Sequence, residues 1–594
     1  MKIPKITVTL QSMQTNRQMK IPNRLPLVII TAMMSLATAA AQQHGKFPKH
    51  EVRAVWLTTL SGLDWPRTSA TGASSIRQQQ QELCDILDKL HAAGINTVLF
   101  QARIRATTVY PSAIEPWDAC LTGTPGRPPG YDPLAFATDE CHKRGMEIQA
   151  WVVTVPIGKW GSAGCQSLRK KHPGLAVRIG DEGYIDPANP ATAGYIASIC
   201  REITSRYDID GIHLDYIRYP ENWPTGGITA RSRRTARRRT SSIKNTTLAE
   251  RQRNITAIVR SVHDAIKRQK PWVKLSCATI GKHSDLARYS SRGWNALVKG
   301  CQDTQEWLRT GIVDQLYPMM YFSGDNFYPF AFDWRENSQG RTIVPGIGTY
   351  RLSRREGDWP VDEVKRQMSV SRAAGMGFAM FRERFFSNNT KGIYAYTKDI
   401  FAPYPALIPP MKWAKADRPG TPGNLKTACA EDYITATWDS IPPLPGGTAY
   451  NIYASSTYPV DTGDPRNLIA VRRKGNSITM KTPRQLYIAV TATDRYGNES
   501  EPLQQEPPAL STATASRLLA CDGRHLAIPG TGNQLDAEYI LLKDLAGRAV
   551  ATRPYRPAHI DVSRVPEGCY AVYSLNAKGA IHRLGFAIIK RKKD

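Results

Sequence analysis

Residues 209–220 read IDGIHLDYIRYP, an apolar run that ends in a carboxylate, an arginine and a proline. Short apolar runs of this kind predict strands, and their near-continuous apolar character predicts burial on both faces, as in a parallel sheet. Seven further runs have the same near-continuous apolar character. They are VRAVWLTT (52–59), INTVLFQA (95–102), MEIQAWVV (146–153), VKLSCAT (273–279), VDQLYPMMYF (313–322), TIVPGIG (342–348) and MGFAMF (376–381).

Amphipathic patterns that predict helices follow most of these runs. They cover residues 79–93, 133–144, 192–206, 248–268 and 361–374. Eight alternating strand–helix units predict an α/β fold, a (β/α)8 TIM barrel, over residues 48–410. An open doubly wound sheet is the alternative. No G-x-G-x-x-G follows the first strand and the chain contains no P-loop, which disfavours the nucleotide-binding versions of that sheet.

The loops that follow the predicted strands are long. The excess length lies in residues 102–132, 153–190, 216–247 and 321–341. In a TIM barrel such loops build the active-site face. Residues 225–247 form a basic insertion in one of them, with seven Arg and Lys residues between 231 and 244 and no acid among them. A solvated basic loop is favoured here over an anion-binding surface.

After a Pro- and Gly-rich linker at residues 414–424, the sequence pattern predicts strands and no helices. Residues 418–507 alternate with a period of two, and their last hairpin, DRYGNES (494–500), resembles that of a fibronectin type III domain. Residues 515–594 form a second β-rich module, which is either an accessory sandwich or a sorting module of exported proteins. The sequence therefore predicts two small all-β sandwich domains after the barrel.

Residues 1–41 predict a signal peptide. This segment contains five basic residues and no acid, and an apolar run spans residues 25–36. Small residues follow the run up to a predicted cleavage site before Gln42. We therefore expect an exported protein that is periplasmic, cell-surface or secreted. No later run reaches 18 uninterrupted apolar residues, so we expect no membrane-spanning segment in the mature chain.

Composition and motif content exclude several classes of protein. Hydrophobic residues make up 41% and charged residues 22% of the 594 residues, which excludes a collagen-like chain or a polytopic membrane protein. A formal charge of +28 would suggest a nucleic-acid partner, but export argues against one. The chain has no C-x-x-C, H-x-H, H-E-x-x-H or G-x-S-x-G motif, so we expect neither a metal nor another cofactor, and no serine hydrolase triad.

Asp215 is the first candidate for catalysis, because it ends a predicted strand and reactive side chains of TIM barrels cluster at strand ends. His213 lies two residues earlier and therefore points the same way. Arg218 could hold a carboxylate in its charged form. Such a carboxylate is what glycosidic chemistry needs. The structural alternatives are that Asp215 caps the next segment and that His213 is a satisfied core residue.

Other strand ends supply partners for Asp215. We expect the second catalytic carboxyl to be Glu115, on a loop that could fold over the cleft, or Glu383, just after the last strand. Aromatic side chains stack on the apolar faces of sugars, so we expect a long aromatic cleft. The further candidates for substrate binding are Arg103, Asp64, Trp65, Trp117, Trp151, Tyr317 and Tyr321. Each tryptophan alone could equally be a loop anchor.

Four ordered motifs resemble the glycosyl-hydrolase-like family 10. They are EVRAVWLTTLSGLDWP (51–66), RIRATTVYPSAIEPWDACLTGTPGRPPGYDPL (103–134), DGIHLDYIRYP (210–220) and DQLYPMMYF (314–322). The resemblance covers about residues 48–405 and implies a TIM-barrel glycoside hydrolase of the cell envelope. The family includes an enzyme that acts on peptidoglycan glycan strands stripped of stem peptides.

The resemblance also implies family motif positions in this chain. They are Asp215, Arg103, Glu115 and Asp132, the last of which we add to the candidates for substrate binding. The chain departs from the family at residues 105–107, where Arg-Ala-Thr stands in place of the R-P-x-G-D of many relatives. A catalytic role at that spot is therefore not expected.

The leading hypothesis is a glycoside hydrolase that cleaves an envelope or dietary polysaccharide, possibly denuded peptidoglycan, by carboxylate acid/base chemistry. A non-catalytic carbohydrate-binding envelope protein on a TIM-barrel scaffold is the first alternative. An anion-binding scaffold that uses the basic insertion is the second. The sequence leaves the oligomeric state open.

Overall fold

The computed structural model describes most of the chain. The described residues are 47–224, 246–291, 294–430, 433–482, 486–504, 518–528, 537–544, 547–555, 558–576 and 581–591. The predicted signal peptide and residues 225–245 of the basic insertion lie outside them. They divide into two compact units, with the boundary near Leu503.

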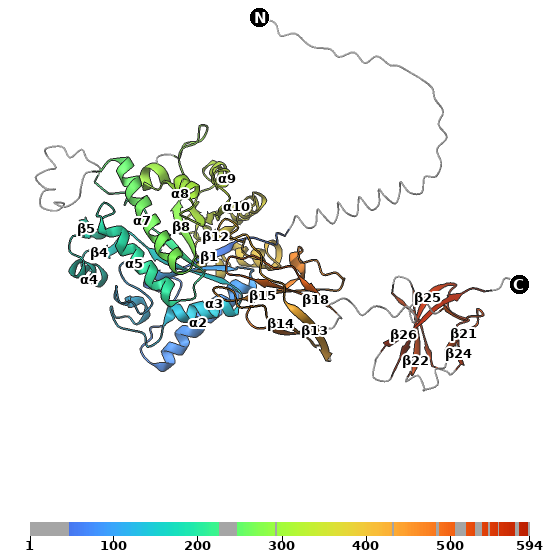
Figure 1. The fold of residues 1–594 in the computed structure, drawn as a ribbon. Coiled ribbons are helices and arrows are strands. Elements are labelled where there is room, and N and C mark those ends of the chain that lie inside the picture. Colours follow the sequence, from blue (N-terminus) through green and yellow to red (C-terminus); the bar gives the residue numbers. More distant parts are fainter. Residues whose placement is uncertain are drawn as a thin grey trace, which may run out of the picture. The chain divides into compact units, whose positions relative to one another are not determined.

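Eight parallel positions close into a barrel, which confirms the predicted TIM-barrel class (Figure 1). The strands are β1 (Arg53–Leu57), β2 (Thr97–Arg103), β3 (Glu147–Val153), β7 (Gly211–Asp215), β8 (Lys274–Ile280), β9 (Gln315–Met319), the short pair β10 (Thr342–Ile343) and β11 (Gly346–Ile347), and β12 (Phe378–Met380). β12 pairs with β1 and closes the ring. Pro345 divides the seventh position into β10 and β11, because proline has no N–H to give to the ladder.

Helices follow the strands along the chain, and the five predicted helices are present among them. They are α2 (Ala73–Ala92), α3 (Pro133–Lys143), α5 (Ala191–Arg206), α7 (Leu248–Gln269), α8 (Thr304–Thr310), α9 (Tyr328–Glu336), α10 (Val361–Ala373) and α11 (Glu383–Ser387). α7 begins with a capping box, in which Thr247 and Glu250 satisfy each other's backbone N–H groups. The loop after β3 adds α4 (Ala163–Lys171) and a small antiparallel sheet of β4 (Pro156–Lys159), β5 (Ala176–Ile179) and β6 (Glu182–Ile185).

The interior of the barrel is more polar than the apolar runs suggest. Outward residues such as Val98, Ile148 and Leu275 belong to the main hydrophobic core that includes the helices. The inward residues of β3 and β8 instead include Glu147 and Lys274, whose charged groups lie 2.7 Å apart. Alternation along each strand separates these two sets of side chains.

Two antiparallel sheets follow the barrel within the same unit. One contains β13 (Gly423–Ala430), β14 (Tyr433–Asp439) and β17 (Ser477–Lys481). The other contains β16 (Leu468–Arg473), β15 (Ala449–Ser455), β18 (Tyr487–Thr493) and β19 (Leu503–Gln504). Their shared core includes Trp438, Ile452 and Val490. An all-β region after the barrel is thereby confirmed, whereas its assignment as a fibronectin type III domain stays a prediction.

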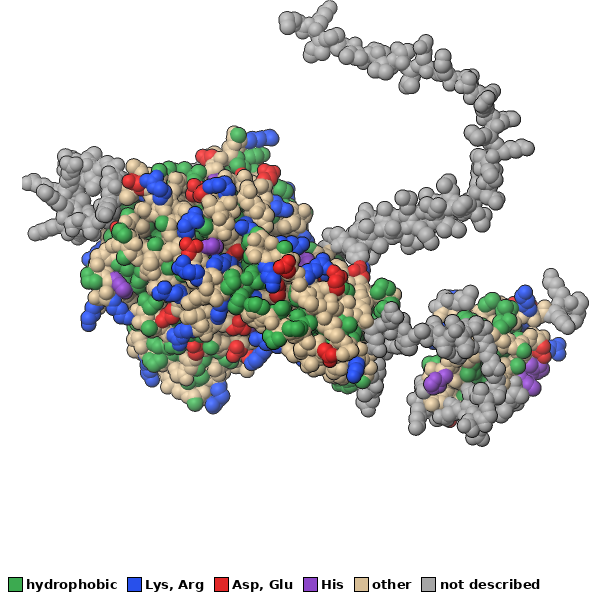
Figure 2. Space-filling view, in the orientation of Figure 1, with side chains coloured by type: hydrophobic (Ala, Val, Ile, Leu, Met, Phe, Trp, Pro, Cys, Tyr) green, Lys and Arg blue, Asp and Glu red, His purple; other side chains and the backbone are tan. Residues whose placement is uncertain are grey.

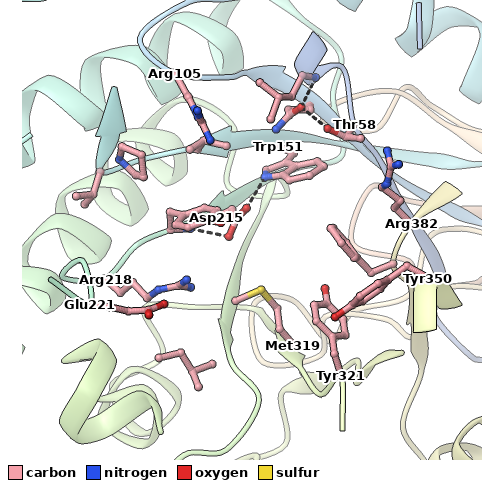
Figure 3. A pocket seen from close by; sticks show the side chains of 18 of the residues that line it. Thr58, Arg105, Trp151, Asp215, Arg218, Glu221, Met319, Tyr321, Tyr350 and Arg382 are labelled. Carbon is pink, nitrogen blue, oxygen red and sulfur yellow. Dashed lines mark hydrogen bonds between the residues drawn. The ribbon is translucent and has the colours of Figure 1, made fainter. Parts of the chain in front are cut away.

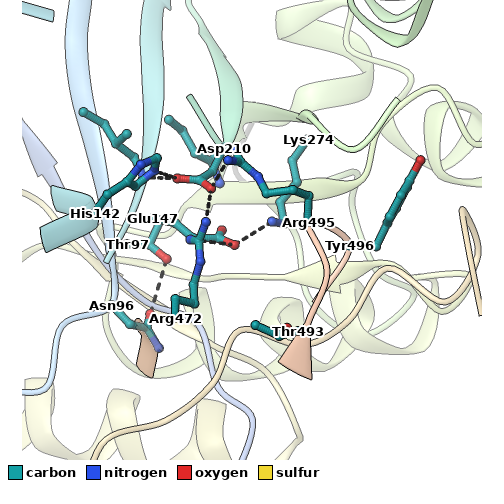
Figure 4. Close-up of polar contacts among 12 residues, drawn as sticks. Asn96, Thr97, His142, Glu147, Asp210, Lys274, Arg472, Thr493, Arg495 and Tyr496 are labelled. Atoms are coloured by element: carbon teal, nitrogen blue, oxygen red, sulfur yellow. Dashed lines mark hydrogen bonds and ion pairs between the residues drawn. The ribbon is translucent and has the colours of Figure 1, made fainter. Parts of the chain in front are cut away.

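This β region is joined to the face of the barrel where the strands begin (Figure 4). Arg472 lies 2.6 Å from Asp210, which directly precedes β7, and 3.5 Å from Glu147 at the start of β3. Arg495 reaches Asp208 at 2.6 Å. Charged groups of the β region therefore contact the starts of β3 and β7, and Lys274 at the start of β8 also pairs with Glu147.

The C-terminal residues form a separate β-only unit. One sheet contains β20 (Leu518–Leu519), β26 (Ile581–Ile589), β25 (Gly568–Leu575), β22 (Tyr539–Lys543) and β23 (Ala549–Pro554). A second sheet pairs β21 (His525–Ile528) with β24 (Ala558–Asp561). Ile540, Leu542 and Val572 lie in its own hydrophobic core. A second β-rich module is confirmed, and a sorting role stays a prediction.

The exterior bears mixed charge. Basic and acidic side chains alternate over the face shown in Figure 2, so neither sign dominates that face. Within the described part of the chain, no helix is long and apolar enough to cross a membrane.

Replacing Arg472 tests the charged contact at the base of the barrel. Arg472→Met leaves Asp210 and Glu147 buried with fewer partners, although His142 still contacts Asp210 at 2.9 Å. We expect the free energy of unfolding to fall by roughly 3 kcal/mol, the lower end of the cost of breaking a buried ion pair. Urea denaturation measures this. Arg473→Met, an exposed neighbour on the same strand, is the control and should change stability little; equal losses in both variants would contradict the prediction.

Candidate active site

A cleft of about 1160 Å³ opens at the end of the barrel where the strands finish (Figure 3). Inward residues at the ends of four strands contribute to it: Trp151, Asp215, Met319 and Phe381. Loop residues complete its walls. This is the face on which TIM barrels carry their chemistry. Described residues of the predicted long loops line it, among them Arg105, Glu182, Tyr216 and Tyr321.

Asp215 is the last residue of β7 and lies at the floor of the cleft. Its side chain is 5% exposed. Trp151 donates its Nε1–H to Oδ2 at 3.1 Å, and the backbone N–H of Tyr216 donates to Oδ1 at 2.6 Å. Burial raises the pKa of this carboxyl, and the nearby Arg218 opposes that rise. The carboxyl is therefore held in one orientation and biased toward its protonated form.

The chain turns sharply after Asp215. Tyr216 has a φ of 50°, in the left-handed region, and its ring lines the cleft. Thr154 fixes the turn from β3, because its backbone N–H and its hydroxyl both donate to the Asp215 carbonyl oxygen, at 2.9 and 2.8 Å. The turn therefore orients the residues that follow the strand, including Arg218.

Aromatic rings form one wall of the cleft. Tyr321 stacks on Phe381, with ring centroids 5.1 Å apart and an interplanar angle of 27°. Tyr350 meets both rings edge-on, at 5.6 and 5.9 Å. Such rings offer flat apolar faces with a polar tip, which suits the C–H faces and hydroxyls of sugars.

Charged groups line the remaining cleft surface. The arginines are Arg105, Arg218, Arg351 and Arg382, and the carboxylates other than Asp215 are Glu182, Glu221 and Glu356. Arg382 is held by Asp64, which lies behind it at 3.0 Å. Within the described residues, no group of three or more His, Cys, Asp or Glu side chains is arranged to hold a metal ion.

Four of the predicted site residues line this cleft. They are Asp215, Trp151, Arg218 and Tyr321. The hydrogen bond from Trp151 to Asp215 adds a contact that the sequence did not suggest. The predicted roles of the four in catalysis and binding stay predictions, because position alone does not test them.

Glu115 and Arg103 do not line the cleft, which corrects the expectation that Glu115 reaches it. Glu115 is 4% exposed and accepts hydrogen bonds from Arg103 Nε and Nη2, both at 2.7 Å, and from the Tyr195 hydroxyl at 2.6 Å. The register of β2 against β3 shifts between Gln101 and Arg103. This irregularity breaks the simple alternation, so Gln101 and Arg105 line the cleft and Arg103 does not.

Glu383 is also displaced from its expected place. It is the first residue of α11 and is 2% exposed, and the adjacent Arg382 lines the cleft instead. Burial raises the pKa of Glu383 to about 7. Asp64, whose pKa burial raises to about 6, supports Arg382 rather than lining the cleft. Neither carboxyl is placed to meet a substrate directly.

His213 and Tyr317 lie inside the barrel below the cleft. Trp56 Nε1 donates to His213 Nε2 at 3.0 Å, and His213 Nδ1 lies 2.8 Å from Ser276 Oγ. Ser276 in turn donates to Gln149 at 2.6 Å. Tyr317 donates to Gln315 at 3.1 Å. These side chains point into the barrel as predicted. They lie below the cleft, however, and are too deep to contact a substrate.

Three further candidates have structural contacts. Trp65 is fully buried and donates Nε1–H to the Gln79 carbonyl at 2.9 Å. Trp117 packs against the main core. Asp132 caps α3 by accepting from two backbone N–H groups and also accepts from Tyr207 at 2.7 Å. None of the three lines the cleft.

Sequence reasoning missed several lining residues. Tyr216 and Glu221 directly follow the predicted strand end, so their loop position was an available signal. Arg105 lies near the end of the second predicted strand, so its position there was also an available signal. Tyr350 and Glu182 lie on loops far from the Asp215 motif, and no local pattern connects them with it.

Comparison with known proteins agrees with this geometry. A family model described as Glycosyl hydrolase-like 10 matches residues 51–349. The chain is 28% identical over 509 residues to "Glycosyl hydrolase YngK" of Bacillus subtilis (strain 168), covering 80% of this chain and 96% of that protein. It is 32% identical over 372 residues to "Glycosyl hydrolase DigH" of Escherichia coli (strain K12), covering 57% of this chain and 84% of that protein.

The pH dependence of stability tests the buried His213. Burial lowers its pKa from 6.5 to about 3, so the unfolded chain binds this proton first as the pH falls. Between about pH 8 and about pH 5 this histidine should lower the free energy of unfolding by about 2 kcal/mol. Urea denaturation at both pH values measures the change.

His213→Gln provides the comparison, because glutamine can still accept from Trp56 without titrating. Between these two pH values, the free energy of unfolding should fall by about 2 kcal/mol less in this variant than in the unaltered protein. An unchanged pH dependence would show that the pKa of His213 is not lowered in the folded barrel, contrary to the prediction.

Proposed function

The chain belongs to the glycosyl hydrolase-like 10 family. From that premise we propose that it is an exported glycoside hydrolase that cleaves a cell-envelope polysaccharide, with peptidoglycan glycan strands free of stem peptides as its substrate. The family and its named relatives support hydrolysis of glycosidic bonds. The envelope location rests on the predicted signal peptide. The substrate rests on the family resemblance and on the form of the cleft.

The observation that carries the proposal is the Asp215 carboxyl at the floor of an aromatic cleft. A glycosidic oxygen is a poor leaving group until it receives a proton. Asp215 is buried, and its pKa is raised by that burial. Each of its oxygens accepts one hydrogen bond, which leaves a lone pair on each for a proton directed into the cleft. We assign Asp215 as the general acid.

The cleft suits a polymer better than a single sugar. Its volume of about 1160 Å³ exceeds that of common small-molecule pockets, roughly 300–1,000 Å³. Trp151, Tyr350 and Phe385 all line it, so it offers several aromatic contacts. Sugar rings bound on either side of Asp215 would place a bond of the chain interior against the acid.

The remaining carboxylates of the cleft lie on loops. Glu182 begins β6, and Glu221 and Glu356 are exposed. They replace Glu115 and Glu383 as candidates for activating water or for stabilising charge at the anomeric carbon.

Replacing Asp215 tests the proposed function. Asp215→Asn preserves the shape of the side chain but removes the proton that is to be donated. We expect hydrolysis of glycan strands freed of stem peptides to fall by about 10²- to 10⁴-fold, the usual contribution of general acid catalysis. Chromatography of released oligosaccharides measures the rate.

Asp362→Asn, an exposed carboxyl on α10, is the matched control and should leave the rate unchanged. Binding of the strands should survive in Asp215→Asn. Full hydrolysis by Asp215→Asn, or no hydrolysis of the strands by the unaltered protein, would refute the proposal.

A further inference from the structure

Two hydrogen-bond donors at the Asp215 end of the cleft have no partner. They are the Tyr321 hydroxyl and Arg218 Nη1, both buried and without an acceptor among the described residues. Both side chains line the cleft. A buried donor without an acceptor costs about 1–3 kcal/mol, so such a group requires an explanation.

Each donor is held by packing rather than by a polar contact. The Arg218 guanidinium lies 4.5 Å from the centre of the Tyr216 ring and 6.0 Å from that of Trp294. Tyr321 is fixed between Phe381 and Tyr350. These two donors have no acceptor among the described residues, so they can serve an acceptor that arrives with the substrate.

The two donors face the same region of the cleft. Figure 3 shows the Tyr321 side chain directed toward the centre of the cleft, with Asp215 and Arg218 on the opposite side. Asp215 and Arg218 are both close enough to act electrostatically on the Tyr321 hydroxyl. An acceptor between Tyr321 and Arg218 would therefore lie beside the acid.

The charge of Arg218 identifies the acceptor. Arg218 Nη1 has no acceptor and Arg218 forms no ion pair among the described residues, although Glu221 lines the same cleft. A guanidinium and a hydroxyl together match a carboxylate, which takes charge-assisted hydrogen bonds from both. A neutral sugar hydroxyl would leave the charge of Arg218 without a counterion.

We propose that Arg218 and Tyr321 bind a carboxylate of the glycan next to the bond that is cleaved, and so select strands whose carboxylates are free. This rests on the proposed function and deepens it. A stem peptide would convert the ether-linked lactyl carboxylate of a strand into an uncharged amide, which cannot pair with Arg218. A uronic acid would supply the same chemistry from a different polymer.

The Tyr216 ring is the cover of this site. Tyr216 is 44% exposed, and its ring lies over the guanidinium that the carboxylate must reach. The incoming carboxylate replaces that ring as the partner of Arg218.

Occupation of the site would also act on the acid. Arg218 is the charge that opposes the raised pKa of Asp215. A bound carboxylate neutralises it, so the pKa of Asp215 rises further and the proton is retained. Because kcat reports the complex and kcat/KM the free enzyme, the alkaline limb of kcat should lie at higher pH than that of kcat/KM.

Binding measurements test the site directly. Asp215→Asn is titrated calorimetrically with three probes: strands freed of stem peptides, the same strands with their carboxylates converted to amides, and a polyuronate oligosaccharide. We expect the free carboxylate strands to bind about 10- to 100-fold more tightly than the amidated strands, as for a charged hydrogen bond. Preferential binding of the polyuronate would assign the carboxylate to a uronic acid instead.

When Arg218→Gln is combined with Asp215→Asn, we expect the preference for free carboxylates to disappear. Free and amidated strands should then bind with equal affinity. Tyr321→Phe keeps the ring stack and should reduce the preference several-fold, which gives a second test if Arg218→Gln does not fold. Arg253→Gln, an exposed arginine on α7, removes the same charge elsewhere and should change nothing.

The outcomes separate this inference from the proposed function. Hydrolysis of free and amidated strands at equal rates, with equal affinity, overturns the carboxylate site and leaves the hydrolase intact. Failure of the unaltered protein to bind or cleave any of the probes overturns both.

Discussion

The buried carboxyl of Asp215 is the constraint on which the rest of the site depends. It ends β7 inside the ring of strands, where the Trp151 indole and the Tyr216 backbone N–H hold both oxygens. Removing this carboxyl from water raises its pKa, and the carboxyl faces a cleft walled by aromatic rings. The roles that we give to the other lining residues depend on where they lie around this carboxyl.

The barrel supports that carboxyl through a polar interior. Trp56, His213, Ser276 and Gln149 form a hydrogen-bonded series beneath the cleft, and the Glu147–Lys274 ion pair lies at the opposite end. Charged side chains of the β region contact that end. Hydrogen bonds of this kind fix rotamers more narrowly than apolar packing does, so the orientation of β3 and β7 is set from both ends.

The apolar runs predicted all eight strand positions because burial on both faces leaves a strong signal in each strand. Position at or just after a strand end also placed Asp215, Trp151 and Tyr321 in the cleft. It failed for Arg103 because β2 shifts register beside it, and for Glu383 because a helix begins there. Tyr350 reaches the cleft through tertiary folding of a distant loop, which a local pattern does not encode.

The central claim is that Asp215 protonates the glycosidic oxygen of a bound glycan. A crystal structure of Asp215→Asn with an oligosaccharide spanning the cleft tests it most directly. The account predicts a glycosidic oxygen within hydrogen-bond distance, about 3 Å, of the Asn side chain at position 215. A chain bound along the cleft with its nearest glycosidic oxygen beside another carboxyl, and position 215 beyond reach, would contradict it.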